Sequence, residues 1–231
     1  EGLTESPCDL VVVFGDTNST IAAALVAAKL HIPVVHVEAG LRSFNRRMPE
    51  EVNRVVTDHV AELHFCSSDA AARQLQREGI STNVFVCGDI MRDAIHNATE
   101  RSNTVNLTDT TSLGDRFAVA TVHRAENTDA PARLSAIMKA LDSLPVPVVL
   151  PLHPRTSRML TEHGISTGSI HTTKPMSYLQ MVAIQDAAKL VLTDSGGMQK
   201  EAYWLKTPCV TMRDETEWTE LIEAGVNVVT G

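Results

Sequence analysis

Short apolar runs rich in Val and Ile alternate along this 231-residue chain with longer segments whose apolar residues recur at helical spacing. This alternation is typical of βαβ units, in which parallel strands are joined by helices that pack on the sheet. The pattern predicts strands over residues 10–14, 34–37, 63–66, 84–87, 117–121, 148–150, 169–172, 190–192, 209–212 and 227–229. It predicts helices over residues 19–30, 50–61, 69–78, 90–99, 130–143, 157–163, 178–187, 198–205 and 216–224.

One segment interrupts the alternation. Residues 100–115 are rich in Thr, Asn, Ser and Asp and carry little periodic hydrophobicity, as linkers do. The interruption predicts two Rossmann-like α/β domains, over residues 1–99 and 116–231. In open parallel sheets ligands bind at the carboxyl ends of the strands, so the loops that follow predicted strands are where functional residues are expected.

Composition narrows the range of partners. The chain has 28 acidic and 20 basic side chains and a formal net charge of −8, which argues against a nonspecific grip on nucleic acid. Its longest apolar stretches fall short of the roughly 20 residues that a membrane span needs, and no signal peptide is evident. Four widely separated cysteines favour buried thiols over disulfides or zinc. We therefore expect a cytoplasmic protein without a metal site.

Two carboxylates follow the first two predicted strands. Asp16 comes directly after Gly15, where it could cap the next helix or serve a functional site. Glu38 ends an apolar strand, where burying an unpaired carboxylate costs free energy. Glu38 therefore needs an ion-pair partner or has a functional role. Arg42 and Arg46 are candidates for neutralising it, and a structural and a functional interpretation of Glu38 both stay open.

The next predicted helix begins with Pro49, Glu50 and Glu51. Proline at the first helical position and acids in the first turn are favourable helix-start chemistry, so both glutamates have a purely structural explanation. Nearby arginines could pair with these acids or receive phosphate oxygens.

Basic and histidine side chains follow two strands of the second domain. His123 and Arg124 come after the strand at 117–121, where a histidine is a candidate for proton transfer or phosphate contact. His153 lies after the strand at 148–150, next to a proline that stiffens the turn, and gives a weaker signal. A structural role for each histidine stays open.

A small-residue loop joins the strand at 190–192 to the following helix. Its residues Ser195, Gly196 and Gly197 place free N–H groups where a diphosphate could approach the helix dipole. Glu201 would lie about one turn into the helix, within reach of a ribose attached to that diphosphate. The loop matches neither the Walker pattern nor the dinucleotide Gly-x-Gly-x-x-Gly pattern, and a simple glycine turn is the alternative.

Taken together, six ordered motifs resemble the UDP-N-acetylglucosamine 2-epimerase family. They are Gly15-Asp16-Thr17, His36-Val37-Glu38-Ala39-Gly40-Leu41-Arg42, Pro49-Glu50-Glu51-Val52-Asn53-Arg54, Thr121-Val122-His123-Arg124, Thr193-Asp194-Ser195-Gly196-Gly197 and Thr216-Glu217. The resemblance implies two domains arranged as in B-type glycosyltransferases, with the sugar nucleotide in the cleft between them. It also implies a cytoplasmic homodimer without a redox cofactor that interconverts UDP-GlcNAc and UDP-ManNAc and supplies ManNAc-type sugars for surface polysaccharide.

The family's chemistry removes the C2 proton, expels UDP on the opposite face, and adds UDP back to the glycal with C2 inverted. By resemblance, Asp16, Glu38, Glu50 and His123 match the catalytic positions. The diphosphate loop matches Ser195, Gly196 and Gly197, and the ribose contact matches Glu201. Arg124 and His153 resemble additional polar contacts of the substrate.

The sequence departs from the family pattern in three places. No Gly-Thr-Arg-Pro-Glu loop precedes Asp9, no closing helix follows Gly231, and Trp218 stands where many members have Arg. The first two lead us to expect a piece lacking the first strands of one domain and the last helix of the other. Three alternatives to the epimerase therefore stay open: a hydrolysing relative that releases ManNAc and UDP, a B-type glycosyltransferase, and a non-catalytic fragment that binds UDP-sugars.

Overall fold

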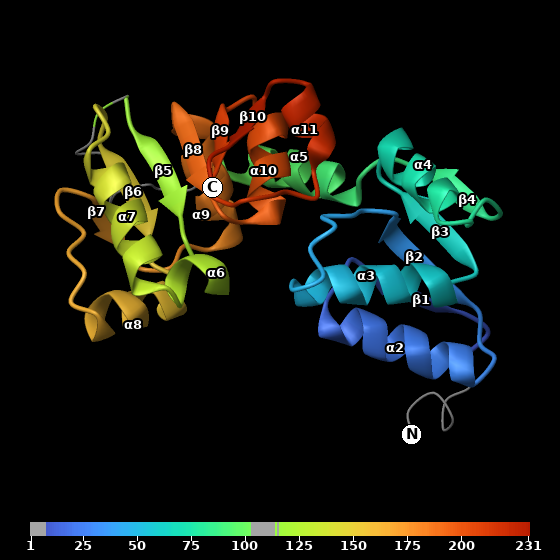
Figure 1. Ribbon diagram of the computed structural model, residues 1–231. Coiled ribbons are helices and arrows are strands. Elements are labelled where there is room, and N and C mark those ends of the chain that lie inside the picture. Colours follow the sequence, from blue (N-terminus) through green and yellow to red (C-terminus); the bar gives the residue numbers. More distant parts are fainter. Residues whose placement is uncertain (1–7, 103–113, 115) are drawn as a thin grey trace. The chain divides into compact units, whose positions relative to one another are not determined.

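The computed structural model describes residues 8–102, 114 and 116–231. Contacts divide the chain into two compact units, one ending at Ile90 and the other beginning at Met91. Each unit is built on its own sheet of parallel strands with connecting helices (Figure 1). The predicted α/β fold class, with two parallel sheets, is confirmed. No helix within the described residues combines the length and apolar character that crossing a membrane requires.

The first unit has a four-stranded sheet in the order β1-β2-β3-β4 over its described residues. Its elements follow one another as β1 (Val11–Phe14), α2 (Asn18–Lys29), β2 (Val34–Ala39), α3 (Pro49–Val60), β3 (Leu63–Cys66), α4 (Asp69–Arg77) and β4 (Val84–Val86). Because sequential parallel strands are joined by right-handed crossovers, the connecting helices fall on the same face of the sheet. In Figure 1, α2 and α3 lie side by side on that face.

Alternation along the strands explains the core of this unit. Val13 and Val34 point to the helix-covered face and pack with Ala24 and Ala27 of α2. Side chains of the opposite face stay largely exposed on the edge strands, where Phe14 is 56% and Phe85 48% accessible. The described helices of the first unit therefore cover one face of its sheet.

The second unit has a six-stranded parallel sheet in the order β10-β9-β8-β5-β6-β7 over its described residues. Its strands are β5 (Ala118–Thr121), β6 (Val148–Pro151), β7 (His171–Thr173), β8 (Leu190–Thr193), β9 (Cys209–Thr211) and β10 (Asn227–Val229). Its helices are α5 (Ile90–Ser102), α6 (Ala125–Thr128), α7 (Pro131–Asp142), α8 (Pro154–Glu162), α9 (Tyr178–Ala187), α10 (Gly196–Trp204) and α11 (Thr219–Glu223).

Both faces of this second sheet are buried. Ala118 and Ala120 of β5 pack in a cluster with Leu134 of α7, whereas Val119 packs in a second cluster with Ile184 of α9. Sheets covered on both faces have strands that are apolar at nearly every position, which is why the sequence shows continuous apolar runs here.

The predicted elements are present with small changes of boundary. All ten predicted strands occur within the described residues. The short helix α6 was not predicted, because four residues carry no readable periodicity. Helix α5 continues to Ser102 and groups with the second unit, so it crosses the predicted boundary at residue 99. The rest of the expected linker, apart from Gly114, lies outside the described residues, and the domain boundaries stay a prediction.

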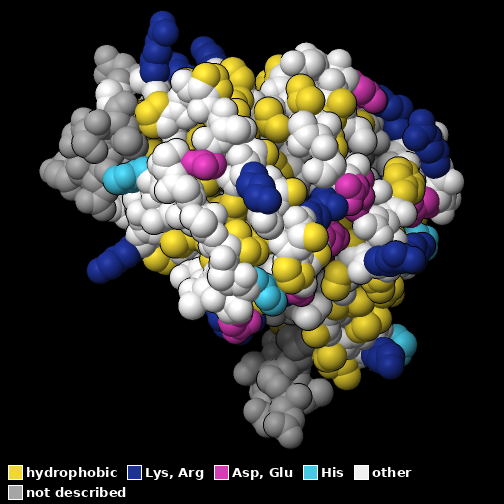
Figure 2. Space-filling view, turned by 60° about the vertical axis from the view of Figure 1, so that its left-hand side comes forward, with side chains coloured by type: hydrophobic (Ala, Val, Ile, Leu, Met, Phe, Trp, Pro, Cys, Tyr) yellow, Lys and Arg dark blue, Asp and Glu magenta, His cyan; other side chains and the backbone are white. Residues whose placement is uncertain are grey.

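Charged side chains of both signs are interspersed over the face shown in Figure 2. The net charge of −8 therefore does not collect into a single acidic patch on that face. Recognition of an anionic ligand has to come from local donors rather than from the overall field of the protein.

A pair of glycines allows the close packing of α4 to be tested. Gly40 and Gly79 both have positive φ angles, of 83° and 87°, but a Cβ on Gly40 would overlap the backbone carbonyl of Ala71, while a Cβ on Gly79 would meet nothing within 4 Å. We predict that Gly79→Ala costs about 1–2 kcal/mol of unfolding free energy, the usual cost of a left-handed non-glycine residue. Gly40→Ala should cost clearly more, because α4 must also shift.

Urea unfolding followed by circular dichroism would measure both variants. Equal losses for Gly40→Ala and Gly79→Ala would show that the approach of α4 to Gly40 imposes no steric constraint of its own.

Candidate functional site

In the first unit, Glu38 lies against the turn that follows β1. Glu38 has a left-handed backbone conformation, with φ of 73°, and the pairing of β2 with β3 shifts register between Val37 and Ala39. Its Oε2 atom lies 3.3 Å from the position that a Cβ on Gly15 would occupy. Left-handed non-glycine residues cost free energy and are concentrated at functional sites. The bulge thus places the Glu38 carboxylate beside the Gly15-Asp16 turn.

Asp16 is held by α3 rather than by its own helix. Its Oδ2 atom lies 2.7 Å from Nη2 of Arg54, whose side chain is 3% exposed, while Asp16 is 30% exposed. Asn53 donates from Nδ2 to the Asp16 carbonyl at 2.9 Å. The prediction that Asp16 caps α2 is wrong: Thr17 is the N-cap and forms a reciprocal capping box with Thr20.

The two glutamates at the start of α3 differ in their surroundings. Glu51 is buried and accepts hydrogen bonds from the backbone N–H groups of Ser43 and Phe44, at 2.9 and 3.0 Å. Glu51 therefore fixes the loop before α3. Glu50 is partly exposed, and its carbonyl accepts a hydrogen bond from Nε of Arg54 at 3.3 Å.

In the second unit, the candidate residues gather at a topological switch point. The chain leaves β5 toward β6 on one side, and later returns to β8 on the other side of β5. Loops from adjacent strands diverge at such a point and leave a crevice outside their carboxyl ends, where open α/β sheets bind ligands. The two strand ends are tied together by Thr121 and Thr193, whose hydroxyl oxygens lie 2.6 Å apart.

Asp194, directly after β8, organises this crevice. It is completely buried and accepts hydrogen bonds from the backbone N–H groups of His123 and Arg124, each at 2.9 Å, and from Nδ2 of Asn127 at 3.1 Å. Its Oδ1 atom lies 3.0 Å from Nδ1 of His123. Burial raises the pKa of Asp194, but the hydrogen bond and charge of His123 and the two backbone donors outweigh it, so the pKa lies below its ordinary value.

His123 is therefore fixed on one side and open on the other. Its side chain is 35% exposed, and Nε2 forms no hydrogen bond among the described residues. A carboxylate on Nδ1 selects the tautomer that leaves Nε2 for a substrate. The ring of His153 lies 5.5 Å from that of His123, centroid to centroid, so these two predicted residues are brought together with Arg124.

The predicted diphosphate loop begins α10. Ser195 is the N-cap residue of α10, and its side chain makes no capping hydrogen bond to the first turn. A Cβ on Gly196 would overlap Oε1 of Glu217, a buried carboxylate whose Oε2 lies 3.0 Å from Nη1 of Arg213. The arginine compensates the negative charge of Glu217 next to the loop.

Glu201 lies further along α10 and faces α9. It is 6% exposed, and its Oε2 accepts a hydrogen bond from Nε2 of Gln185 at 2.9 Å. Burial raises the pKa of Glu201 above its ordinary value, and the hydrogen bonds from Gln185 and Tyr178 only partly oppose this. Its immediate partners are thus protein side chains.

Trp218, the departure from the family pattern, is also buried. Nζ of Lys200 lies 3.7 Å from the centre of its ring, a cation–π contact that gives the buried ammonium group a partner. The indole N–H has no hydrogen-bond partner among the described residues and lies 3.5 Å from the Cβ position of Gly196.

The structure brings Glu38 beside the Gly15-Asp16 turn in the first unit, and His123, Arg124 and His153 together in the second, whereas Glu201 faces α9. Sequence reasoning left two supporting residues out of the site, Asp194 and Arg54. Asp194 carried the same signal as Glu38, an acid at the end of a buried strand, and could have been found by it. Arg54 had no local signal, because its partner Asp16 is distant in the sequence.

Two parallel-sheet α/β units, one with a histidine–aspartate pair beside a helix start at its switch point, define the class: an α/β protein built on open parallel sheets, in which ligands bind at the carboxyl ends of the strands. The family model described as UDP-N-acetylglucosamine 2-epimerase matches residues 1–231. The chain belongs to the UDP-N-acetylglucosamine 2-epimerase family.

Individual relatives agree with this assignment. The UDP-2,3-diacetamido-2,3-dideoxy-D-glucuronate 2-epimerase of Pseudomonas aeruginosa is 47% identical over 96% of this chain and 63% of the relative. A UDP-N-acetylglucosamine 2-epimerase homolog of Methanococcus maripaludis is 45% identical, over 99% of this chain and 66% of its own length. The chain thus spans about two thirds of the length of these relatives.

A solved structure gives the same result. The UDP-GlcNAc 2-epimerase of Methanocaldococcus jannaschii, crystallised with UDP-GlcNAc and UDP, superposes with a TM-score of 0.91 at 41% identity. The match covers 100% of this chain and 67% of that one.

The buried Asp194 predicts a specific pH dependence of stability. Because its pKa is lowered in the folded state, it stabilises the fold above the unfolded-state pKa of about 3.9, and this contribution is lost as the pH falls through the folded-state value. Asp194→Asn should lower the unfolding free energy at pH 7 by about 3 kcal/mol, as expected when one partner of a buried pair is removed. The difference from the unchanged protein should shrink below about pH 4.

Denaturant unfolding between pH 3 and pH 7 would test this, with Asp214→Asn as control. Asp214 is 63% exposed and pairs with Arg133, so its replacement should cost at most about 1 kcal/mol. A cost for Asp194→Asn that is the same at pH 3 and pH 7 would contradict the prediction.

The start of α10 offers a second matched pair. Gly196→Ala should destabilise the protein, because the added Cβ must displace the Glu217 carboxylate. Gly197→Ala adds a Cβ that meets only the flexible end of Met91, at 3.4 Å, so it should be neutral or stabilise by up to about 1 kcal/mol through helix propensity. Thermal unfolding would distinguish the two variants, and an equally stable Gly196→Ala would count against the described position of Glu217.

Proposed function

We propose that the protein to which this chain belongs inverts C2 of a UDP-linked sugar, interconverting UDP-GlcNAc and UDP-ManNAc. The observation that carries the proposal is the Asp194–His123 pair at the switch point beside the start of α10, in a chain that belongs to the UDP-N-acetylglucosamine 2-epimerase family. The proposed course is loss of the C2 proton and departure of UDP on the opposite face to give a glycal, followed by return of UDP to C1 and addition of a proton to the other face of C2.

In this proposal the second unit binds the nucleotide. The first N–H groups of α10 and the Ser195 hydroxyl bind the diphosphate, because the helix dipole favours an anion there and the side chain of the N-cap residue makes no capping hydrogen bond. Gly196 gives the ligand close access to the backbone. Glu201 is the proposed ribose contact, and Arg124 and His153 are proposed as further polar contacts.

His123 assists the departure of UDP. Negative charge grows on the diphosphate as the bond to C1 breaks, and donors aimed at that charge lower the barrier. With Nδ1 held by Asp194, Nε2 of His123 is the atom that can donate a hydrogen bond to the leaving phosphate or carry a proton.

The first unit supplies the carboxylates for the C2 proton. The C2 hydrogen is weakly acidic, so its removal needs a positioned base and has to be coupled to the departure of a good leaving group. Asp16 and Glu38 lie on neighbouring strand ends, and Glu50 lies at the start of α3. We propose that one of the three removes the proton from C2 and that another, protonated from solvent, donates a proton to the opposite face of C2.

Proton NMR of the full-length protein with UDP-GlcNAc in deuterated buffer would test the proposal. We expect UDP-ManNAc with deuterium at C2, formed without any acceptor. Free ManNAc and UDP would instead identify a hydrolysing enzyme, and turnover only with an added acceptor would identify a glycosyltransferase. Binding of UDP without turnover would leave a sugar-nucleotide-binding protein.

A second substrate is favoured by one observation. The relative from Pseudomonas aeruginosa, at 47% identity, is a UDP-2,3-diacetamido-2,3-dideoxy-D-glucuronate 2-epimerase. The same C2 inversion on that diacetamido sugar is therefore the alternative function. A comparison of kcat/KM for the two UDP-sugars with one enzyme preparation would decide between them. The homodimer, the cytoplasmic location and the supply of ManNAc-type sugars for surface polysaccharide are proposed from the family resemblance alone.

A further inference from the structure

A buried histidine–aspartate pair lies beneath the strand ends of the first unit. His36 of β2 and Asp58 of α3 are both completely inaccessible to solvent, and Nδ1 of His36 lies 2.6 Å from Oδ1 of Asp58. Nε2 of His36 lies 2.8 Å from the Gly15 carbonyl oxygen, which can only accept a hydrogen bond. His36 is one of the histidines for which the sequence suggested no role beyond structure.

The carboxylate of Asp58 is ionised. Its second oxygen, Oδ2, accepts hydrogen bonds from Nη1 of Arg42 at 2.7 Å and from the Gly40 N–H at 3.2 Å. Burial raises the pKa of Asp58, but the hydrogen bond and charge of His36, followed by those of Arg42, outweigh it and hold the pKa below its ordinary value. The His36 ring thus contacts a carboxylate through Nδ1 and a backbone carbonyl through Nε2.

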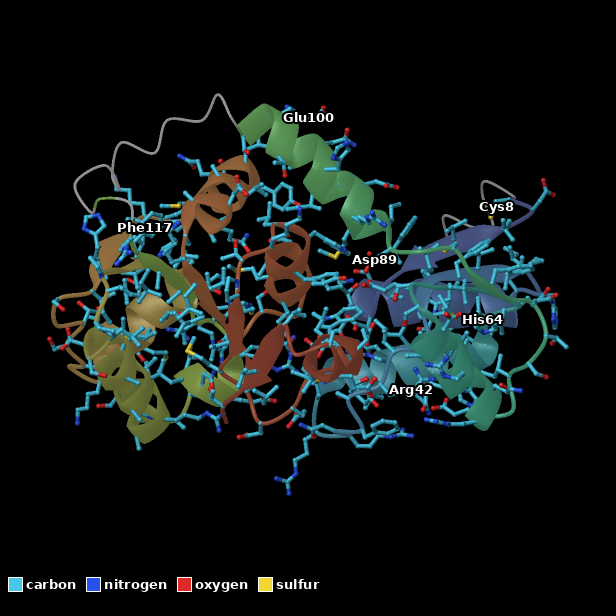
Figure 3. All side chains as sticks on the ribbon, turned by 90° about the horizontal axis from the view of Figure 1, so that it is seen from above. Cys8, Arg42, His64, Asp89, Glu100 and Phe117 are labelled. Carbon is cyan, nitrogen blue, oxygen red and sulfur yellow. The ribbon has the colours of Figure 1, made fainter. Side chains whose placement is uncertain are left out.

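Arg42 is itself fixed in place. It donates from Nε and Nη2 to the two carboxylate oxygens of Glu78, at 2.8 and 2.7 Å. The sequence suggests Arg42 as a partner of Glu38, but Arg42 forms ion pairs with Asp58 and Glu78, which lie on α3 and just after α4. Figure 3 labels Arg42 in the loop after β2 and His64 on the neighbouring strand β3.

The His36–Asp58 pair thus binds the backbone at Gly15 and Gly40, next to the proposed catalytic carboxylates of Asp16 and Glu38. Gly15 immediately precedes Asp16, and Gly40 follows Glu38 by two residues. Gly15, Glu38 and Gly40 all have positive φ, at 61°, 73° and 83°, a conformation that needs support from the surroundings. One buried pair therefore holds the two turns in their left-handed conformations.

We propose that His36 and Asp58 are positioning residues that set the placement of Asp16 and Glu38 for the reaction at C2. The proposal rests on the proposed function for the role of those two carboxylates. A buried ion pair is a poor source of stability, since well-packed apolar residues often serve equally well or better. His36 occupies a core position of β2 between Val35 and Val37, where the distinctive contribution of its ring is the pair of bonds to Asp58 and Gly15.

The structure provides a matched control. His64 lies directly beside His36 in the sheet, is also buried, and bonds through Nε2 to the carbonyl of Asp58 at 2.7 Å. Among the described residues it makes no bond to the turns at Gly15 or Gly40. Its replacement removes a buried imidazole of the same sheet and leaves the two turns bound.

Three variants of the full-length protein test the proposal by steady-state kinetics with UDP-GlcNAc. In His36→Asn the amide nitrogen lies near the position of Nδ1, so the bond to Asp58 can form but the bond to Gly15 is lost. In His36→Gln the amide nitrogen lies near the position of Nε2, so the bond to Gly15 can form. We expect kcat to fall about 10–100-fold for His36→Asn with KM changed less than about 3-fold, as for a displaced catalytic group. His36→Gln should recover part of this loss, and His64→Gln should keep kcat within about 3-fold while lowering the melting temperature.

Hydrogen exchange distinguishes failure of this proposal from failure of the proposed function, because it needs no turnover. The amides of residues 15–18 and 38–41 should exchange at least about 10-fold faster in His36→Asn than in the unchanged protein or in His64→Gln. Faster exchange in a protein without epimerase activity would overturn the proposed function and leave the anchoring of the turns in place. Unchanged exchange, or equal losses of kcat for His36→Asn and His64→Gln, would overturn the positioning role.

Discussion

Each of the two units is organised around one aspartate that is completely buried. Removing a carboxylate from water costs several kcal/mol unless donors converge on it, so the surrounding chain has to be arranged to supply them. Asp58 contacts His36 of β2 and accepts hydrogen bonds from Gly40 and Arg42 of the loop after β2. Asp194 accepts hydrogen bonds from the backbone of the two residues before α6, His123 and Arg124, and from Asn127 of α6. In both units the requirement of a single carboxylate brings together loops that are distant in the sequence.

Asp58 and Asp194 differ in the solvent exposure of the histidines with which they pair. Asp58 pairs with a histidine that is inaccessible and uses both ring nitrogens within the protein, so the pair can only hold the backbone in place. Asp194 pairs with a histidine that is 35% exposed and has one nitrogen without a partner among the described residues. The same chemical pair therefore acts as a support in the first unit and as a proposed participant in the reaction in the second. Exposure of one ring atom makes the difference.

The sequence predicts those features of the fold that depend on local pattern. All ten strands of the described residues are predictable because a sheet covered by helices requires short apolar runs. Pairing between distant residues was not predictable in the same way. Asp16, Thr17 and Asn18 are all good helix caps, and only the position of Arg54 on α3 shows that Asp16 is occupied elsewhere.

The same limitation explains Arg42 and Asp194. Arg42 lies four residues from Glu38, but the carboxylates with which it pairs are on or next to α3 and α4, which the linear sequence does not place beside it. Asp194 was read only as part of a loop motif, because its donors come from residues about seventy positions earlier. The positions of side chains at a site thus depend on the packing of whole elements.

Trp218 shows how a departure from the family pattern is accommodated. An arginine at this position would bring a positive charge toward Gly196; here the charge belongs to Lys200, and it lies over the indole ring at 3.7 Å. The ring separates the ammonium group from solvent and supplies the partner that a buried cation needs. Trp218 and Glu217 both lie against Gly196, so two side chains of the segment after β9 leave no room for a larger residue at the start of α10. The constraint on Gly196 therefore comes from two side chains of another loop, in addition to the need for close access to the backbone.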